Sequence, residues 1–510
     1  MHLGQLAALT PDKPAVVMAG GGPTVTYADL DRRSREFAGL LRAHGLGPKD
    51  HVAVLMDNTP EFLSVAWGCQ RSGVYWTPVN WHLTEEEAAY VVRDCGARVL
   101  VASEQVAALA GRIAAGNTGL DAAVVTGPGR DGLEGLDDAL ARVVDTDAPA
   151  EEVEGTYFFY SSGTTGMPKG IKPDHAFPPF GTGLTIDHIM ASAFGFGPGS
   201  VYLCPAPLYH AAPAGWSLGT QRNGGTVVVM EKFDPLECLR AIERHGITHV
   251  QFVPTHFVRL LKLPEEVRWG FDLSSLQVVV HAAAPCPPEV KRRMIDWLGP
   301  KILEFYAGSE GTGMTMIDSA DWLAHPGSVG RAAQGTVHIV GDDGTEVPTG
   351  EIGSIYFSGG GTFEYHNDPE KTAAAFNERG WTTLGDMGHL DDDGFLYLAD
   401  RRTDLIISGG VNVYPAEIEE ALIMHAAVAD VAVVGVPDDE MGQSVRAVVQ
   451  CTPGVAGTPE LAEELVRGCR ERLAGFKCPR SVVFVDELPR LPSGKLLRRR
   501  VREEQAGTTR

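Results

Sequence analysis

Short apolar runs alternate with amphipathic stretches over the first two thirds of the chain. From Val52 an apolar strand is followed by a turn at Asn58-Thr59-Pro60, an amphipathic helix and a second apolar strand that ends near Val79. This order is typical of a βαβ unit, which builds parallel sheets. Further strands are predicted at 98–101, 122–125, 157–160, 201–203, 226–230, 247–253 and 276–280, and intervening helices at 84–94 and 235–245. The pattern predicts two doubly wound α/β lobes.

The pattern of apolar and turn residues changes after Gly335. Between 335 and 400, short strands alternate with Asp-Gly and Pro-Thr-Gly turns, which predicts a small antiparallel β lobe. From Arg401 the pattern returns to mixed α/β, with helices expected at 415–424 and 460–473 and strands at 431–436 and 445–450. This last stretch of about 110 residues has the size of a small domain. We therefore expect an α/β protein with a large N-terminal domain over 1–400 and a smaller α/β C-terminal domain over 401–510.

Composition narrows the class of protein. A chain of 510 residues is too long for one hydrophobic core, and 44% hydrophobic with 21% charged residues is ordinary for a globular protein. The net charge of -23 argues against a nucleic-acid partner. Eight scattered cysteines without a C-x-x-C pair disfavour disulfides and zinc. No secretory signal and no apolar run of about 18–20 residues is seen, so a cytoplasmic protein without a membrane span is expected.

The first candidate functional motif is YSSGTTGMPKG, residues 160–170. Small residues let backbone N–H groups approach phosphate oxygens, while hydroxyls and a lysine add further contacts. It is not the common P-loop, because Pro168 precedes Lys169 and Gly170 follows it. A flexible surface loop is the alternative interpretation. The order of the residues favours a polyphosphate-binding loop.

This stretch resembles the phosphate-loop signature of the adenylate-forming superfamily, which includes acyl-CoA synthetases, aryl-CoA ligases, luciferases and peptide-synthetase adenylation domains. Further matches extend the resemblance over nearly all 510 residues. It implies that a carboxylate attacks the α-phosphate of ATP to give an acyl-AMP, with Mg²⁺ as cofactor, and that the CoA thiolate then displaces AMP. The residues that it assigns to the phosphates are Ser161, Ser162, Gly163, Thr164, Thr165, Gly166 and Lys169.

Two later motifs resemble the family's nucleotide-binding elements. In YAGSEGTG, the resemblance implies that Tyr306 stacks on adenine, Ser309 meets the α-phosphate and Glu310 helps to hold Mg²⁺. In WTTLGDMG, Asp386 corresponds to the carboxylate that binds both ribose hydroxyls, and Arg401 corresponds to a second ribose contact. The alternatives are a tyrosine at a strand end, solvated acidic residues in turns for Glu310 and Asp386, and a solvated arginine at a domain edge.

The C-terminal region resembles the family's mobile domain. In LPRLPSGKLLRR, Lys495 corresponds to the lysine that bridges the carboxylate and the α-phosphate during adenylation. The resemblance implies that this domain rotates between the two steps about a hinge at Thr403. Many relatives carry Asp or Lys at the pivot, so Thr403 puts in doubt how the two states are balanced.

The resemblance also implies a CoA site. Gly409 and Gly410 would line the pantetheine tunnel, where little more than hydrogen fits. In FKCPR, Lys477 and Arg480 stand where some aryl-CoA ligases place cations against the CoA nucleotide. Ordinary surface charges are the alternative for these two residues.

The acyl pocket is expected to involve PLYHAAP and VVHAAAPCP. His210 matches a family position beside the substrate carboxylate, and the three alanines after His281 leave room for a bulky group. No buried acidic anchor for an α-amino group is visible near Gly215-Trp216, which favours a hydrophobic acid that is fatty, aryl or polycyclic. The candidate pocket residues are His210, Trp216, Phe252, His281, Ala282, Ala283 and Ala284. The hydrophobic core is the alternative for Trp216 and Phe252, and a buried, hydrogen-bonded histidine is the alternative for His210.

We therefore predict an AMP-forming acid:CoA ligase whose partners are a small carboxylic acid, ATP and CoA. Within the same fold, a luciferase-like oxygenase and a ligase that delivers to a carrier protein remain alternatives. A protein of a different class would carry out only one half-reaction, which Thr403 and the Pro173-Asp174 pair, where many relatives have Thr-His, leave open. A homodimer is a further open alternative.

Overall fold

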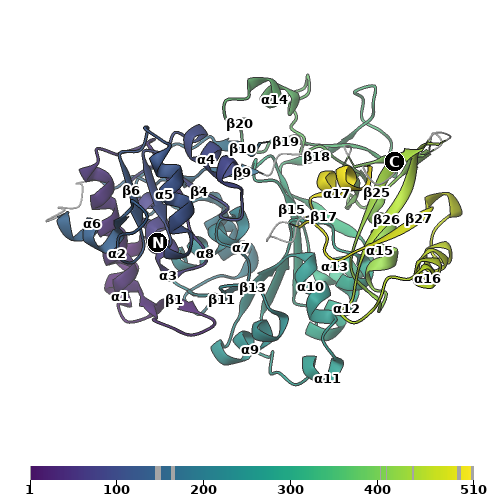
Figure 1. Ribbon diagram of the computed structural model, residues 1–510, viewed down its shortest axis with the longest axis horizontal. Coiled ribbons are helices and arrows are strands. Elements are labelled where there is room, and N and C mark those ends of the chain that lie inside the picture. Colours follow the sequence, from purple (N-terminus) through teal and green to yellow (C-terminus); the bar gives the residue numbers. More distant parts are fainter. Residues whose placement is uncertain are drawn as a thin grey trace. The chain divides into compact units, whose positions relative to one another are not determined.

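The computed structural model describes residues 2–143, 151–161, 167–401, 404–408, 411–438, 441–490 and 496–506 (Figure 1). The chain divides into two compact units. Unit 1 comprises Met1–Gln251, Glu265–Val279 and Thr362–Thr372, and unit 2 comprises Phe252–Pro264, Val280–Gly361 and Ala373–Arg510. Among the described residues, no helix has both the length and the apolar character needed to cross a bilayer.

Unit 1 contains a parallel six-stranded sheet in the order β7-β6-β5-β3-β4-β8. Its strands are β3 (His51–Leu55), β4 (Tyr75–Pro78), β5 (Val99–Ala102), β6 (Ala122–Val125), β7 (Glu134–Gly135) and β8 (Thr156–Tyr157). The crossover helices include α3 (Pro60–Arg71), α4 (Glu85–Asp94) and α5 (Ala107–Ala115). The predicted βαβ unit is therefore β3-α3-β4, with Pro60 in the first turn of its helix, where no N–H is needed.

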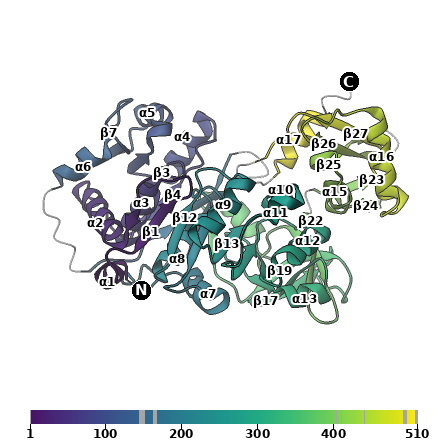
Figure 2. The ribbon, with the colours of Figure 1, turned by 90° about the horizontal axis from the view of Figure 1, so that it is seen from below.

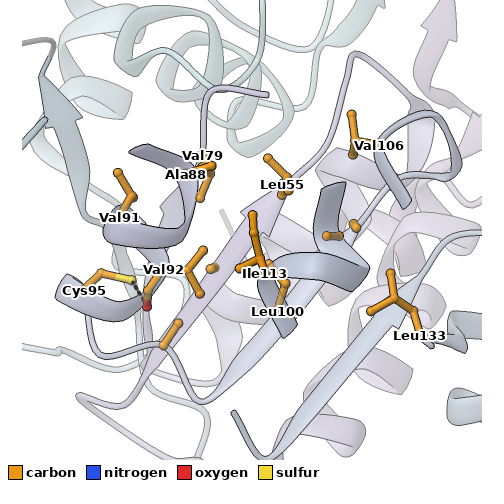
Figure 3. Close-up of a cluster of buried hydrophobic side chains, with 14 of the residues drawn as sticks. Leu55, Val79, Ala88, Val91, Val92, Cys95, Leu100, Val106, Ile113 and Leu133 are labelled. Atoms are coloured by element: carbon orange, nitrogen blue, oxygen red, sulfur yellow. Dashed lines mark hydrogen bonds between the residues drawn. The ribbon is translucent and has the colours of Figure 1, made fainter. Parts of the chain in front are cut away.

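Helix α4 is fixed at its start by Thr84 and Glu87. The Thr84 hydroxyl accepts from the Glu87 amide, and the Glu87 carboxylate accepts from the Thr84 amide at 2.9 Å, which is a capping box. The inner face of α4 packs with α5 on the sheet, and Figure 3 shows Val92, Leu55, Leu100 and Ile113 in this buried cluster. The helix ends at Asp94, after the buried residues Val91 and Val92 that pack it on the sheet.

The second sheet of unit 1 has the order β13-β11-β12-β1-β2 over its described pairs. Its strands are β1 (Pro14–Met18), β2 (Val25–Thr26), β11 (Val201–Cys204), β12 (Thr226–Val229) and β13 (His249–Phe252). All pairs are parallel except β1 with β2. Helix α9 (Pro235–His245) begins after the capping Asp234 and ends at Gly246, whose φ of 58° is the left-handed conformation that glycine adopts readily.

A third, antiparallel sheet of unit 1 joins β9 (Phe159–Ser161), β10 (Lys169–Pro173) and β20 (Phe363–Tyr365). The sequence predicts one strand over 157–160, whereas the structure divides it between β8 and β9 in two different sheets. The Phe158 amide donates to the Trp76 carbonyl at 2.8 Å, and from Phe159 onward the chain pairs with β10 instead. The two strands flanking the predicted phosphate loop therefore form a hairpin.

Unit 2 contains an antiparallel sheet in the order β18-β19-β21-β22-β17-β16-β15. The strands are β15 (Ile302–Ala307), β16 (Met314–Ile317), β17 (Ser328–Gln334), β18 (Thr336–Val340), β19 (Gly353–Ser358), β21 (Asp386–Leu390) and β22 (Leu396–Arg401). This is the hairpin-rich region predicted for 335–400. Its core is formed by Val329, Ile339, Ile355, Phe357 and Leu396.

The end of the chain, also in unit 2, contains a hairpin of β23 (Ile406–Ser408) and β24 (Val411–Val413). A three-stranded sheet follows, made of β25 (Val428–Asp438), β26 (Gly442–Cys451) and β27 (Ser481–Val485). Helices α15 (Pro415–Ile423), α16 (Pro459–Arg470) and α17 (Arg498–Ala506) pack against it (Figure 2). Ala432, Val434, Val448, Leu488 and Val501 form the core of this part.

Candidate active site

The predicted phosphate loop connects the two strands of the β9-β10 hairpin in unit 1. Ser162, Gly163, Thr164, Thr165 and Gly166 lie outside the described residues, whereas Ser161 is the last residue of β9 and Lys169 the first of β10. These two residues are paired in register, so the ends of the loop lie side by side. The Lys169 ammonium lies 3.9 Å from the Asp368 carboxylate, and its side chain is one quarter exposed, at 25%. The lysine therefore lies where the chain returns from the loop into β10.

The candidate residues for adenosine come together in unit 2. Tyr306 stands near the end of β15, and its hydroxyl donates to Asp386 Oδ2 at 2.7 Å. Asp386 begins β21 and is paired in register with Arg401, the last residue of β22. Both Tyr306 and Asp386 are half-buried. The sheet thus brings together residues separated by 80 positions that the sequence motifs assign to one nucleoside.

Glu310 and Ser309 lie in the turn that follows β15, Ser309 exposed and Glu310 half-buried. A Cβ added to Gly308 would stand 2.7 Å from Glu310 Oε2 and 2.5 Å from a methyl carbon of Leu384. A side chain at Gly308 would therefore push the Glu310 carboxylate away. In the part of the chain that the structure describes, no three His, Cys, Asp or Glu side chains gather as a metal site.

The aromatic candidates for the acyl pocket are buried in packed clusters. Trp216, on α8 (Ala211–Arg222) of unit 1, is 2% exposed and packs against Phe194 and Phe196 at centroid distances of 5.0 and 5.6 Å. Phe252 is 1% exposed and contacts Phe257 within unit 2. This is the packing of core residues, so their role in the acyl pocket stays a prediction. His210 is half-buried at the N-terminus of α8, beside the Tyr209 ring at 4.5 Å.

His281 ends β14 (Val278–His281) and is fully buried. The alanines after it differ in exposure: Ala282 is buried, whereas Ala283 and Ala284 are exposed. Ala283 has a φ of 75°, a conformation that L-residues rarely adopt. The chain therefore turns sharply after His281 and presents two small side chains on the surface of unit 2.

A buried ion pair that sequence reasoning missed lies beside His281. Lys291, on α12 (Pro288–Leu298), is fully buried and its ammonium is 2.5 Å from Glu304 Oε2, which is 3.5 Å from His281 Nε2. Burial, and secondarily the charge of Lys291, lowers the pKa of His281, so the ring is neutral. Burial raises the pKa of Glu304, and Lys291 opposes that shift. No sequence signal identified Lys291, since a lysine on an amphipathic helix usually faces solvent.

The candidate residues for CoA are divided. The candidate CoA residues Gly409 and Gly410 lie outside the described residues, and so do the hinge candidate Thr403 and the catalytic candidate Lys495. The Lys477 ammonium lies 2.5 Å from Glu417 Oε2, which partly neutralises it. Arg480 lines a cavity of about 380 Å³ whose other walls include Ser408, Val411, Arg470 and Phe476. Phe476, the first residue of FKCPR, is 58% exposed; it was not predicted as a site residue, although it stands within that motif.

Comparison with known proteins identifies the family. The sequence model described as "AMP-binding enzyme" matches residues 4–365, and the one described as "AMP-binding enzyme C-terminal domain" matches residues 417–495. The chain is 36% identical to feruloyl-CoA synthase of an Amycolatopsis species, over 96% of this chain and 95% of that protein. It is 33% identical to the long-chain-fatty-acid–CoA ligase FadD13 of Mycobacterium tuberculosis, over 99% and 98%.

The fold agrees with this assignment. The crystal structure of ATP-bound MatB from Rhodopseudomonas palustris superposes with a TM-score of 0.82 at 30% identity, covering 100% of both chains. The predicted α/β architecture is therefore confirmed. Because family models cover most of the sequence and the relatives match nearly its whole length, the chain belongs to the AMP-binding enzyme family, that is, to the adenylate-forming superfamily.

Proposed function

We propose that this protein is an AMP-forming acid:CoA ligase that activates a hydrophobic carboxylic acid with ATP and transfers it to CoA. The observation that carries the proposal is similarity over nearly the whole length to a feruloyl-CoA synthase, at 36% identity, and to a long-chain-fatty-acid–CoA ligase, at 33% identity. The retained motif residues add support, since Lys169, Glu310, Asp386, Arg401 and Lys495 are all present.

In the first step, a carboxylate oxygen of the acid attacks the α-phosphorus of ATP, and pyrophosphate leaves. Lys169 and the hydroxyls of 161–165 hold the β- and γ-phosphates, and Lys495 bridges the carboxylate and the α-phosphate, stabilising the negative charge that develops there. Mg²⁺ bound at Glu310 would neutralise phosphate charge, which suits a hard cation that binds through one carboxylate and the substrate's own phosphates. Ser309 donates to the α-phosphate.

The adenosine of ATP is held by the cluster on the antiparallel sheet of unit 2. The Tyr306 ring stacks on adenine, while its hydroxyl donates to Asp386 Oδ2 at 2.7 Å and so orients that carboxylate. The two oxygens of Asp386 accept from the two ribose hydroxyls, and Arg401 adds a second contact. The hydrogen bond between Tyr306 and Asp386 supports this part of the proposal, because it joins the two groups that one nucleoside would touch.

In the second step, the CoA thiolate attacks the acyl carbonyl carbon and AMP leaves. We propose that residues 401–510 form the domain that rotates about Thr403 between the steps, which the C-terminal family match over 417–495 supports. Gly409 and Gly410, which have no side chains, are proposed to line the pantetheine tunnel. The cavity lined by Arg470, Arg480 and Phe476 offers cations for the CoA phosphates and an exposed ring for its adenine.

The acid is proposed to be a fatty, aryl or polycyclic one. Feruloyl-CoA synthase and a long-chain-fatty-acid–CoA ligase, as their names state, act on one aryl and one aliphatic acid. His210 is proposed to stand beside the substrate carboxylate, and the exposed alanines Ala283 and Ala284 leave space for a bulky group. A cytoplasmic location is proposed in addition, because the scattered cysteines without a C-x-x-C pair are typical of a reducing compartment.

The test is a panel of fatty, aryl and polycyclic acids. Pyrophosphate release reports the first step, and mass spectrometry of the products reports acyl transfer, with CoA and an acyl-carrier protein offered in separate reactions. A parallel assay supplies ready-made acyl-AMP with CoA. We expect pyrophosphate and acyl-CoA to appear together with at least one acid. Acyl-CoA formed only from supplied acyl-AMP would overturn the two-step proposal in favour of a single half-reaction, and acyl transfer to the carrier protein alone would overturn CoA as the acceptor.

A further inference from the structure

Asp94, the last residue of α4, contacts two segments that are distant in sequence. The Tyr160 hydroxyl donates to Asp94 Oδ2 at 2.6 Å, and the Asn367 side-chain amide donates to Oδ1 at 3.1 Å. The imidazole of His366 donates from Nε2 to the backbone carbonyl of Asp94 at 2.9 Å. Both carboxylate oxygens and the backbone carbonyl of Asp94 therefore accept hydrogen bonds. The end of α4 is bonded in this way to residue 160 and to residues 366–367.

Both of these segments adjoin Lys169. Tyr160 is paired with Gly170 across the hairpin, and a Cβ on Gly170 would stand 3.0 Å from the Tyr160 ring, so the ring lies directly against the backbone beside the lysine. The His366 amide donates to the Gly170 carbonyl at 2.9 Å. The Tyr160 ring and the His366 amide thus both contact Gly170, and both residues are hydrogen-bonded to Asp94.

The turn after β20 adds a third connection. Asn367 has a φ of 56°, a left-handed conformation that asparagine tolerates better than most residues but that still costs energy. Its side chain bonds Asp94, and the next residue, Asp368, carries the carboxylate that lies 3.9 Å from the Lys169 ammonium. The bond to Asp94 therefore fixes the turn that places this carboxylate.

We propose that Asp94 is a positioning residue for Lys169, acting through Tyr160 on one side and through residues 366–368 on the other. The inference rests on the proposed role of Lys169 in holding the β- and γ-phosphates of ATP. Over the described residues, Asp94 bonds Tyr160, His366 and Asn367, so the role assigned to it is one of positioning and not of catalysis. Burial raises the pKa of the Tyr160 hydroxyl, with the bond to Asp94 adding to the shift, and this keeps the phenol a hydrogen-bond donor at neutral pH.

Three substitutions separate this role from a general effect on folding. Asp94→Ala removes both carboxylate contacts, Asp94→Asn keeps the shape but exchanges one acceptor for a donor, and Tyr160→Phe removes a single hydrogen bond. The matched control is Asp121→Ala, which removes a surface carboxylate that pairs with Arg98 in the same unit. Because hydrogen bonds to charged acceptors are strong, we expect the KM for ATP to rise about tenfold in Asp94→Ala and less in the other two variants.

The discriminating readout is the second half-reaction, since acyl-AMP carries no β- or γ-phosphate. Thioester formation from supplied acyl-AMP is expected to stay within about twofold of the wild type in all variants. Calorimetric titration with a non-hydrolysable ATP analogue and with AMP gives the same contrast without turnover: Asp94→Ala weakens binding of the analogue and leaves that of AMP unchanged.

Equal losses in both half-reactions, or an unchanged ratio of analogue to AMP affinity in Asp94→Ala and Tyr160→Phe, would overturn the inference. A wild-type protein that releases no pyrophosphate with any acid would instead overturn the proposed function. In that case the binding ratio still decides the role of Asp94, so the two failures are distinguishable.

Discussion

The hydrogen bond between Tyr306 and Asp386 makes the proposed nucleotide contact measurable. Tyr306→Phe keeps the ring that stacks on adenine and removes only the hydroxyl that donates to Asp386 Oδ2 at 2.7 Å. A hydrogen bond to a charged acceptor contributes about 1.5–3 kcal/mol. Because both side chains are half-buried, the lower end applies. About 1.5 kcal/mol is the ceiling for the loss of affinity, since the bond is also present in the AMP-free protein, and it corresponds to at most roughly tenfold weaker binding of AMP.

The assay is calorimetric titration of AMP into the wild type, Tyr306→Phe, Asp386→Ala and the double variant. Asp386→Ala is expected to weaken binding more than Tyr306→Phe, since it removes the acceptor of both ribose hydroxyls. The double variant should bind within about 0.5 kcal/mol of Asp386→Ala alone, because the hydroxyl acts through the carboxylate. A matched control is Tyr397→Phe, which removes a hydroxyl that donates to Asp391 at 3.2 Å in the same sheet.

Additive losses in the double variant would refute the reasoning that Tyr306 orients Asp386. An unchanged affinity in Asp386→Ala would remove that carboxylate from the nucleotide site altogether. A loss in Tyr397→Phe as large as that in Tyr306→Phe would show that any hydroxyl–carboxylate bond of this sheet affects binding, and the effect would then be one of sheet stability.

Lys495→Ala is expected to abolish pyrophosphate release and to leave thioester formation from supplied acyl-AMP largely intact; equal loss of both would contradict domain rotation. Lys291→Met leaves Glu304 buried without its counter-charge and should lower the free energy of unfolding, measured by urea titration, by about 3–5 kcal/mol. The double variant Lys291→Met/Glu304→Leu should recover most of that stability. A double variant as unstable as Lys291→Met would refute this reasoning. His256 is buried, and burial lowers its pKa to about 3 from 6.5, so the unfolded chain takes up the proton first and stability falls as the pH drops from 6.5 toward 3. At pH 5 this amounts to about 2 kcal/mol, and His256→Gln should show a correspondingly smaller shift in urea midpoint between pH 7 and pH 5; an equal shift would count against the assignment.

Local periodicity was sufficient for much of the architecture. The stretch from Val52 to Pro78 forms β3, α3 and β4 in the predicted order, because alternating apolar runs, a proline in the first turn and an amphipathic helix are all local properties. The Asp-Gly turns likewise gave the antiparallel strands of unit 2, since hairpins pair residues close in sequence. The family motifs assign Tyr306 and Asp386 to the nucleotide, a role that stays a prediction, and the structure places the Tyr306 hydroxyl 2.7 Å from Asp386 Oδ2.

Other features depend on contacts that no local pattern contains. The apolar run at 157–160 is one stretch in the sequence, yet its two halves pair with different strands. Trp216 could equally belong to a pocket or to the core, and only its packing against Phe194 shows how it is buried.

Charged side chains show the difference most clearly. A lysine on an amphipathic helix normally faces water, but Lys291 is buried because Glu304, on a neighbouring strand, supplies its counter-charge. Asp94 ends its helix as an ordinary polar residue in the sequence, and its partners lie 66 and 273 positions away. The sequence by itself determined which residues can carry the chemistry. Only the tertiary structure decided which of them touch, because burial and hydrogen bonding between distant segments are properties of the packed chain.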